Sequence, residues 1–225
     1  MLKLYFNGSP NPSKVALFLE EAGLPYEAIP IDTRKGQQFE PAFTAINPNQ
    51  KVPVIVDGQT TVFDSTAILL YLAEKTGKFL PEATPAQRGR LLSWLMFVGT
   101  GVGPYSGQAV HFKHFAKTPQ PYAHDRYQFE AHRHFGIIEA QLKATPYMLG
   151  KTYTIVDMSL WGWSRMIPFI LGEDAWAKYP GIKRLTDEIS ARPAAIKAVA
   201  LKDKHVFKTE MDDEARRNMF RHVTA

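Results

Sequence analysis

The sequence predicts a two-domain protein, in which a small α/β domain precedes an all-helical domain. Two observations favour this prediction. Short strand and helix patterns alternate up to residue 80, whereas only long helical patterns follow the proline-containing stretch 81–87. A chain of 225 residues is long enough to form two cores. We therefore expect a first domain at residues 1–80, a linker at 81–87 and a second domain at 88–225.

The first domain begins with a βαβ pattern. Apolar and polar residues alternate over Leu2–Phe6, as in a strand with one buried face. The apolar spacing then predicts a helix from about Pro12 to Ala22, with Asn11 as its N-cap and Gly23 at its C-terminal end. A second strand over Tyr26–Asp32 would lie parallel to the first, because the helix between them forms a crossover.

A hairpin and a helix complete the first domain. Val54–Val56 and Thr61–Phe63 are short strands separated by an Asp-Gly turn, and a helix follows from Ser65 to about Thr76. The resulting order, βαβ and then ββα, is that of a thioredoxin-like domain. In such a fold the turn after the first strand usually carries a Cys-x-x-Cys motif, but this chain contains no cysteine. A thiol used at this turn must therefore come from a ligand.

The second domain is predicted to be all-helical, although the glycine-rich stretch 99–104 interrupts its first helix. Thr154 stands three residues before Asp157, which is the spacing of a capping box at a helix start. The expected helices are Arg88 to Val98, Tyr122 to Thr145, Asp157 to Leu171, Tyr179 to Ala191 and Ala194 to Ala200.

Composition excludes several classes of function. With 45% hydrophobic and 22% charged residues the chain is globular, and no apolar run is long enough to span a membrane. We expect a cytoplasmic protein with no membrane partner. The formal net charge of +5 is spread among acidic residues, so no nucleic-acid partner is expected. Five of the seven histidines lie within 111–134, but no cysteine or well-spaced carboxylate completes a metal site.

Four stretches of the sequence carry a family resemblance: SPNPSKVALFLEEAGL at the first turn, KGQQFEPAFTAINPNQKVPVIVD, FDSTAILLYLAEKTG, and GPYSGQAVHF with PYAHDRYQFE in the helical region. The chain resembles cytosolic glutathione transferases over nearly its whole length. Within them it is similar to the bacterial nu class, whose members act chiefly as glutathione-dependent disulfide-bond reductases. The resemblance implies the glutathione transferase fold, a homodimer, and glutathione as a cosubstrate that brings the thiol.

The first turn has the chemistry to activate that thiol. A free thiol has a pKa of about 8.5 and is mostly protonated at neutral pH. The Ser9 hydroxyl can donate a hydrogen bond to the thiolate, and the Asn11 amide adds the positive end of the helix dipole. The nu class usually has threonine at the position of Ser9. Two alternatives remain: Asn11 as a plain helix cap, and Tyr5 as the activator, although packing is the favoured role for Tyr5.

The resemblance implies further glutathione contacts in the α/β domain. The Val52-Pro53 peptide bond would be cis, leaving the Val52 backbone to pair with the cysteinyl part of glutathione as an added strand does. Lys51 and Gln38 would reach the carboxylate at the glycyl end. Without the resemblance, both would be read as ordinary polar surface or loop residues.

The γ-glutamyl end of glutathione carries an ammonium and a carboxylate, and adjacent residues suit both. Asp64 would meet the ammonium, while the amide and hydroxyl of Ser65 would bind the carboxylate at a helix start. Most relatives have glutamate in place of Asp64, and helix capping is the alternative role of this pair. Arg133 would reach glutathione across the dimer interface, or else be a surface arginine.

The second substrate is expected to bind in the helical domain, near the glycine-rich stretch. Tyr105, Gln108 and Phe112 are the candidates to line this pocket, and each would also suit a core position. We predict glutathione-dependent reduction of small disulfides. Conjugation of glutathione to electrophiles is the alternative reaction, and a non-catalytic binding module is the alternative of another class.

Overall fold

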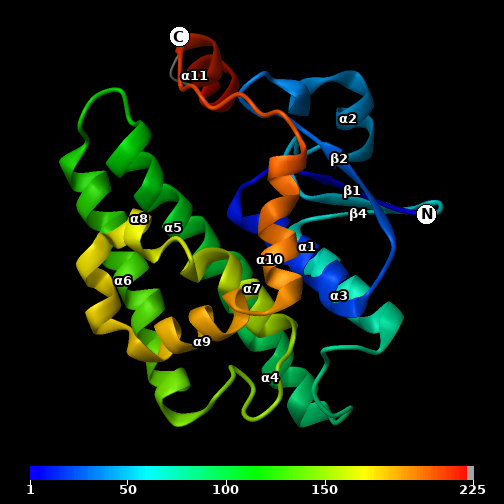
Figure 1. The fold of residues 1–225 in the computed structure, drawn as a ribbon. Helices are drawn as coiled ribbons and strands as arrows, with labels where there is room; N and C mark the ends of the chain where they lie inside the picture. Colours follow the sequence, from blue (N-terminus) through cyan, green and yellow to red (C-terminus); the bar gives the residue numbers. More distant parts are fainter. Residues whose placement is uncertain (222–225) are drawn as a thin grey trace. The chain divides into compact units, whose positions relative to one another are not determined.

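The structure, a computed structural model, describes residues 1–221. By internal contacts the chain divides into two compact units (Figure 1). One unit joins Met1–Tyr71 to the described part of the segment that begins at Pro193, and the other is Leu72–Arg192. This division differs from the expected ranges 1–80 and 88–225, because residues 193–221 belong to the N-terminal unit.

The N-terminal unit contains a four-stranded mixed sheet in the order β2-β1-β3-β4. Strand β1 pairs parallel with β2 and antiparallel with β3, and β4 closes a hairpin with β3. The strands are β1 (Leu2–Phe6), β2 (Tyr26–Pro30), β3 (Val54–Asp57) and β4 (Thr60–Phe63). This sheet confirms the predicted thioredoxin-like βαβ-ββα order.

The register of the sheet brings distant segments to one edge. Tyr5, near the end of β1, lies opposite Val54 at the start of β3. Val54 in turn lies opposite Phe63 at the end of β4, and Phe6 lies opposite Pro30 at the end of β2. The residues that follow β1, β2 and β4 and those that precede β3 therefore emerge at the same edge of the sheet.

Helix α1 begins earlier than the sequence predicted. Ser9, not Asn11, is its N-cap, and Asn11 lies inside the first turn, because Pro10 suits the first helical position. The helix ends as predicted, with Gly23 in the left-handed conformation at φ 68°. The α-helices of this unit are α1 (Pro10–Ala22), α2 (Pro41–Ile46), α10 (Pro193–Ala200), which packs on α1, and α11 (Asp213–Met219). Helix α3 (Ser65–Thr76) begins in this unit and continues past its boundary at Tyr71.

The other unit is helical, as predicted. The expected interruption at 99–104 is instead a π-helical segment, so the chain continues as helix from α4 into α5. Two glycines allow this close packing: a Cβ atom on Gly101 would lie 2.7 Å from Nε2 of His134, and one on Gly103 would lie 2.9 Å from Nε1 of Trp163. The elements here are α4 (Pro85–Met96), η2 (Phe97–Val102), α5 (Gly103–Val110), η3 (His111–Phe115), α6 (Pro121–Ala144), α7 (Ile155–Ser164), α8 (Ile167–Leu171), η4 (Glu173–Lys178) and α9 (Pro180–Ser190).

The start of α7 confirms the predicted capping box. The Thr154 side chain accepts a hydrogen bond from Val156, and Oδ2 of Asp157 accepts one from the Thr154 N–H at 2.9 Å. Oδ1 of Asp157 also accepts the N–H of Met148 at 2.8 Å. The expected single helix from Asp157 to Leu171 is divided into α7 and α8.

Candidate active site

The turn after β1 is organised by Asn7, a residue that sequence reasoning did not single out. Oδ1 of Asn7 accepts the backbone N–H of Ser9 at 3.0 Å and the Ser9 hydroxyl at 2.6 Å. Nδ2 of Asn7 donates to Oγ1 of Thr33, 3.3 Å away in the loop after β2. The Asn-x-Ser spacing of an Asx turn was the available signal in the sequence. Asn7 thus fixes the candidate catalytic Ser9 and ties it to the next loop.

The first turn of α1 presents one backbone donor in particular. Its first three residues are Pro10, Asn11 and Pro12, and because proline has no N–H, Asn11 supplies the only amide hydrogen among them. The backbone N–H of Ser13 donates to the Ser9 carbonyl at 3.4 Å. The Asn11 N–H therefore presents the positive end of the helix dipole, at the position where the sequence analysis expects the thiolate.

The segment before β3 is held by a second asparagine that sequence reasoning missed. Asn47 is buried, and its Nδ2 donates to the Lys51 carbonyl at 2.6 Å while its Oδ1 accepts the N–H of Asn49 at 2.9 Å. The Val52-Pro53 bond is cis, which confirms what the resemblance implied. Lys51 is exposed and Val52 is half-buried. Both residues stand at the same sheet edge as Ser9.

Asp64 and Ser65 stand at the start of α3. Asp64 has a left-handed backbone with φ 73°, and its Oδ1 accepts the N–H groups of Thr66 at 2.8 Å and Ala67 at 3.2 Å. The capping role considered for this pair is therefore real. Asp64 is exposed and Ser65 is buried. A role in binding glutathione stays a prediction and is compatible with the cap, since one carboxylate offers several acceptor positions.

A buried lysine lies in the same unit. Lys14 in α1 is only 1% exposed, and burial lowers its pKa from 10.5 to about 7, a shift that the nearby Asp64 carboxylate partly opposes. Sequence reasoning missed it, although its position four residues before the buried Phe18 places it on the apolar face of the helix. The cationic form of Lys14 therefore lies close to one of the expected ligand-binding carboxylates.

Two further predicted residues of this unit have defined surroundings. Gln38 is buried, its Nε2 donates to the carbonyls of Thr33 at 3.2 Å and Asn218 at 3.3 Å, and its Oε1 has no partner among the described residues. Tyr5 packs against Phe43 with ring centroids 5.9 Å apart, in an apolar cluster. This contact agrees with the packing role favoured for Tyr5.

A cavity of about 380 Å³ lies in the helical unit, where the second-substrate pocket was predicted. Its lining includes Tyr105 and Gln108, both named from the sequence. Phe112 is not among the lining residues, but its ring stacks on the lining residue Tyr127 at 5.4 Å. The lining residues are Pro104, Tyr105, Gln108, Arg126 and Tyr127.

The cation of Arg133 is engaged within its own helix. Its Nε donates to Oε2 of Glu130 at 2.9 Å, and Arg126 reaches the other oxygen of Glu130 at 3.1 Å. The hydrogen bond from Arg133 is the main cause that lowers the pKa of Glu130. Nδ1 of His134 lies 2.6 Å from the Glu130 carbonyl, and its ring stacks on Tyr105 at 5.0 Å. Burial lowers the pKa of His134, which favours the neutral ring.

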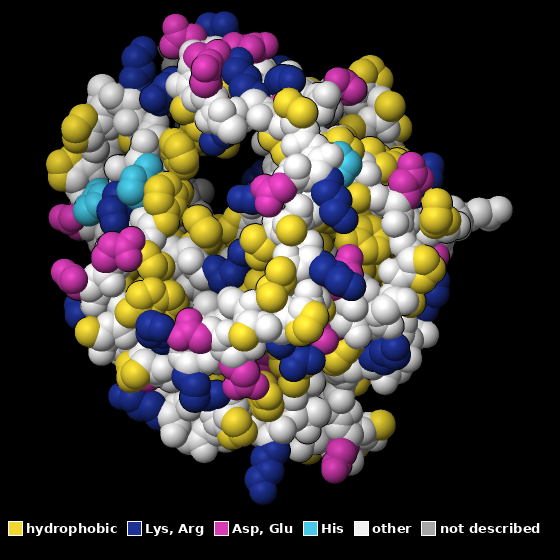
Figure 2. All heavy atoms as spheres, in the orientation of Figure 1, with side chains coloured by type: hydrophobic (Ala, Val, Ile, Leu, Met, Phe, Trp, Pro, Cys, Tyr) yellow, Lys and Arg dark blue, Asp and Glu magenta, His cyan; other side chains and the backbone are white. Residues whose placement is uncertain are grey.

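Other classes of site find no support in the described chain. No group of three or more His, Asp or Glu side chains within residues 1–221 is arranged to hold a metal ion. Over the same range no helix has the length and apolar character needed to cross a membrane. Lysine, arginine and acidic side chains are interspersed on the face seen in Figure 2.

Comparison with known proteins places the chain in a family. Residues 8–75 match the glutathione S-transferase N-terminal domain, and residues 109–200 match the C-terminal domain. The chain is 41% identical over 213 residues to the disulfide-bond oxidoreductase YfcG of Escherichia coli (strain K12), covering 88% of this chain and 94% of that protein. It is 36% identical over 212 residues to the disulfide-bond oxidoreductase YghU of the same bacterium, covering 86% and 72%.

Solved structures agree with the sequence relatives. A glutathione transferase family member from Pseudomonas fluorescens, with two glutathione bound, is 34% identical with a TM-score of 0.82, covering 88% of this chain and 92% of that one. A glutathione transferase from Pseudomonas putida, with one glutathione disulfide bound per subunit, is 33% identical with a TM-score of 0.81, covering 88% and 90%. The chain belongs to the glutathione S-transferase family. Glutathione is the cosubstrate of this family of enzymes.

Proposed function

We propose that this protein is a nu-class-like, glutathione-dependent disulfide-bond reductase. The observation that carries the proposal is the meeting of three segments at one sheet edge: the Ser9 turn, the cis Val52-Pro53 bond and the start of α3. These are the segments that sequence reasoning assigned to the thiol, the cysteinyl backbone and the γ-glutamyl end of glutathione. The names of YfcG and YghU support the reaction.

The reaction is thiol–disulfide exchange without a protein cysteine. A glutathione thiolate, held by the Ser9 hydroxyl and the Asn11 amide, attacks one sulfur of the substrate disulfide. A new S–S bond forms, and the other sulfur leaves with the electron pair and takes a proton. A second glutathione thiolate then attacks the mixed disulfide, releasing the second thiol and glutathione disulfide. The substrate gains two electrons and two glutathione molecules lose them.

Glutathione is proposed to lie extended along the sheet edge. The Val52 backbone pairs with its cysteinyl part. Lys51 and Gln38 face the glycyl carboxylate, while Asp64 and Ser65 take the γ-glutamyl ammonium and carboxylate. The N-terminal domain, residues 1–80, thus binds glutathione in this proposal.

We propose that the helical domain, predicted from the sequence at residues 88–225, supplies the second-substrate pocket at the cavity lined by Tyr105 and Gln108. Phe112 supports this pocket by stacking on the lining residue Tyr127. The aromatic lining also suits an aryl electrophile, so conjugation of glutathione is the second candidate reaction. Both reactions use the same thiolate, so they differ in the second substrate alone.

A homodimer is part of the proposal. Large apolar side chains are exposed on α4 and α6, where Met96 is 40% and Phe129 is 62% exposed, and Phe63 at the end of β4 is 42% exposed. Burial against a second copy would remove these surfaces from water. Arg133 would then approach glutathione across the interface. A cytoplasmic location stays a prediction.

The test is glutathione-dependent reduction of hydroxyethyl disulfide, coupled to glutathione reductase and NADPH. An aryl-halide conjugation assay is run on the same preparation. We expect fast disulfide turnover with weak conjugation, and loss of turnover in Ser9→Ala but not in Tyr5→Phe. Asn11→Ala keeps the backbone N–H and should retain turnover, so a loss in this variant would assign the role to the Asn11 side chain instead. The reverse ratio would identify a conjugating transferase. No activity in either assay, together with no glutathione binding by calorimetry, would identify a non-catalytic module.

A further inference from the structure

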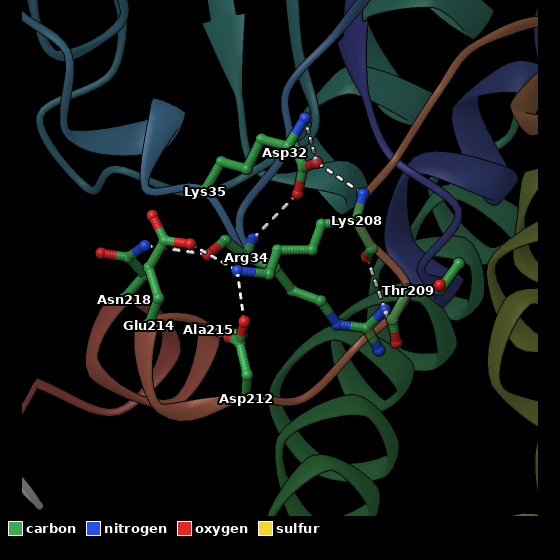
Figure 3. A network of polar contacts seen from close by, with 9 residues as sticks. All are labelled: Asp32, Arg34, Lys35, Lys208, Thr209, Asp212, Glu214, Ala215 and Asn218. Atoms are coloured by element: carbon green, nitrogen blue, oxygen red, sulfur yellow. Dashed lines mark hydrogen bonds and ion pairs between the residues drawn. The ribbon is translucent and has the colours of Figure 1, made fainter.

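Residues 202–221 pack on the loop that carries Gln38. We call residues 202–221 the strap and residues 31–40 the β2–α2 loop. Figure 3 shows the polar contacts between them, all within the N-terminal unit. The sequence left this tail unassigned, because its mixed charges form no apolar pattern that indicates a packing partner.

Asp32 anchors the loop to the strap. Its carboxylate is buried, and Oδ2 accepts the backbone N–H of Lys208 at 2.7 Å. Oδ1 accepts the N–H of Arg34 at 3.1 Å within the loop itself. A buried carboxylate is costly unless hydrogen bonds satisfy it. The strap supplies the shortest of these bonds, so the ordered loop depends on the presence of the strap.

Arg34 and Asn218 add further hydrogen bonds between the loop and the strap. Nη1 of Arg34 donates to the carbonyls of Lys208 at 2.8 Å and Thr209 at 2.9 Å. In return, Nδ2 of Asn218 donates to the Arg34 carbonyl at 2.8 Å. Hydrogen bonds therefore join the strap to the loop at two places, one before α11 and one within α11, and each bond pairs a side chain with a backbone carbonyl.

The same helix α11 reaches the candidate glutathione ligand. The Asn218 carbonyl accepts a hydrogen bond from Nε2 of Gln38 at 3.3 Å. A Cβ atom on Gly36, whose φ is 80°, would lie 3.0 Å from Oδ1 of Asn218, so the contact needs glycine here. The guanidinium of Arg221 lies 4.4 Å from the ring centre of Phe39. Three neighbouring positions of the loop thus touch the strap.

The strap is itself braced. Nζ of Lys208 pairs with Asp212 at 2.8 Å and also with Glu214, and Asp212 caps α11 by accepting the N–H of Ala215 at 2.9 Å. Both signs of charge gather over α11 in Figure 2. At its start the strap also lies beside the catalytic turn, since a Cβ atom on Gly8 would be 3.1 Å from Cδ of Lys202.

We propose that the strap is a positioning element of the glutathione site, which holds Gln38 and the β2–α2 loop in place beside the glycyl end of glutathione. This inference rests on the proposed function, since it takes glutathione as the ligand. The hydrogen bonds of the strap to Asp32, Arg34 and Gln38 fall on the β2–α2 loop, so we expect its effect on affinity for the glycyl end and not on the chemistry of the thiol.

The test compares two ligands that differ only at that end. Glutathione and γ-glutamylcysteine share the thiol and the γ-glutamyl group, but γ-glutamylcysteine lacks the glycyl residue. The double variant Arg34→Lys with Asn218→Ala keeps the net charge and removes the side-chain hydrogen bonds of Arg34 and Asn218 between loop and strap, while the backbone contacts of Lys208 and Gln38 remain. We expect calorimetry to show about tenfold weaker binding of glutathione. Binding of γ-glutamylcysteine should be unchanged, and kcat at saturating glutathione should be close to that of the wild type.

The matched control is Arg217→Lys with Thr209→Ala. It makes the same kinds of substitution on exposed strap residues whose side chains have no hydrogen bond to the loop within residues 1–221. We expect wild-type affinity for both ligands. The single variant Asn218→Ala, which keeps Arg34, gives a second, milder measurement if the double variant is poorly folded, and should weaken glutathione binding selectively as well.

The possible results separate the two hypotheses. Suppose that the wild type binds glutathione. If the double variant then binds both ligands equally more weakly, or binds glutathione as tightly as the wild type, the positioning role is overturned and the proposed function stays intact. Tighter glutathione binding would overturn it too, because the strap would then compete with the ligand for Gln38. A wild-type protein that binds neither ligand would overturn the proposed function and this inference with it.

Discussion

The Ser9 hydroxyl donates a 2.6 Å hydrogen bond to Oδ1 of Asn7, the same atom that accepts the Ser9 backbone N–H at 3.0 Å. The hydroxyl hydrogen is therefore directed at Asn7. To stabilise a glutathione thiolate, this hydroxyl must rotate away from Asn7, while the backbone bond keeps the turn in place. The charge on the thiolate makes that exchange favourable, since hydrogen bonds to ionised acceptors are stronger.

Replacing Ser9 by alanine tests the hydroxyl. We expect Ser9→Ala to lower kcat/KM for disulfide reduction about 100-fold, as loss of one donor to a charged centre does. The pKa of bound glutathione, read from thiolate ultraviolet absorbance, should rise. Ser9→Thr keeps the hydroxyl and is expected to retain activity. Equal loss in both variants would show that the shape of the turn matters and the hydroxyl does not.

The substitution Asn7→Asp tests how charge beside Ser9 affects the bound thiol, because aspartate has nearly the same size as asparagine. Asn7→Asp keeps the acceptor for the turn but adds a negative charge beside the thiolate, which should raise the pKa of bound glutathione by about one unit. Gln59→Glu is the matched control, because it adds the same charge in the exposed β3–β4 turn at the other edge of the sheet. A shift of the same size in both variants would argue for a long-range charge effect.

Lys14 makes stability depend on pH. Its folded pKa of about 7 lies below the ordinary value of 10.5, so between these values the unfolded chain binds more protons than the folded one. Stability should therefore rise from pH 7 towards pH 10, by on the order of 4 kcal/mol from this group. Lys14→Met removes the penalty, so urea unfolding should show a more stable protein at pH 7 and a smaller gain at higher pH.

The control for Lys14 is Lys3→Met, because the Lys3 side chain is 45% exposed and pairs with Glu27 across 3.9 Å. We expect a change within about 0.5 kcal/mol at either pH. A Lys14→Met variant that is less stable than the wild type at neutral pH would show that the buried amine has a stabilising partner.

Asp157 is expected to support the helical unit. It satisfies the N–H groups of Met148 and Thr154 from a fully buried position, so Asp157→Ala leaves two buried donors unpaired. We expect the free energy of unfolding to fall by about 2–4 kcal/mol. Asp187→Ala, which removes an exposed carboxylate paired with Lys183, should cost less than about 0.5 kcal/mol. Chemical denaturation of both variants measures the difference.

Local patterns predicted most of the elements. Alternating residues at Leu2–Phe6, the apolar spacing from Val15 to Ala22 and the Thr154 to Asp157 spacing all describe neighbours in the chain, and the structure confirms each. The errors were local too. Pro10 was not recognised as the first residue of α1, and the glycines at 99–103 were read as a break, whereas packing against His134 and Trp163 makes use of them.

The candidate site was predictable in part. Ser9, Asn11, Val52 and Ser65 lie beside strand ends, and a thioredoxin-like order is enough to bring strand ends to one edge. Asn7 was missed although its Asn-x-Ser spacing indicates an Asx turn. Asn47 was missed because it satisfies a backbone carbonyl in a segment whose shape is known only after folding.

The sequence by itself determined the order of strands and helices, because hydrophobic periodicity is a local property of the chain. It also determined that any thiol must come from a ligand, because the composition includes no cysteine. Three-dimensional packing alone decided that Lys14 is buried and that Lys208 closes on Asp32, 176 positions away. Such contacts have no periodic signature. They form because a buried polar group must find a partner wherever the fold brings one.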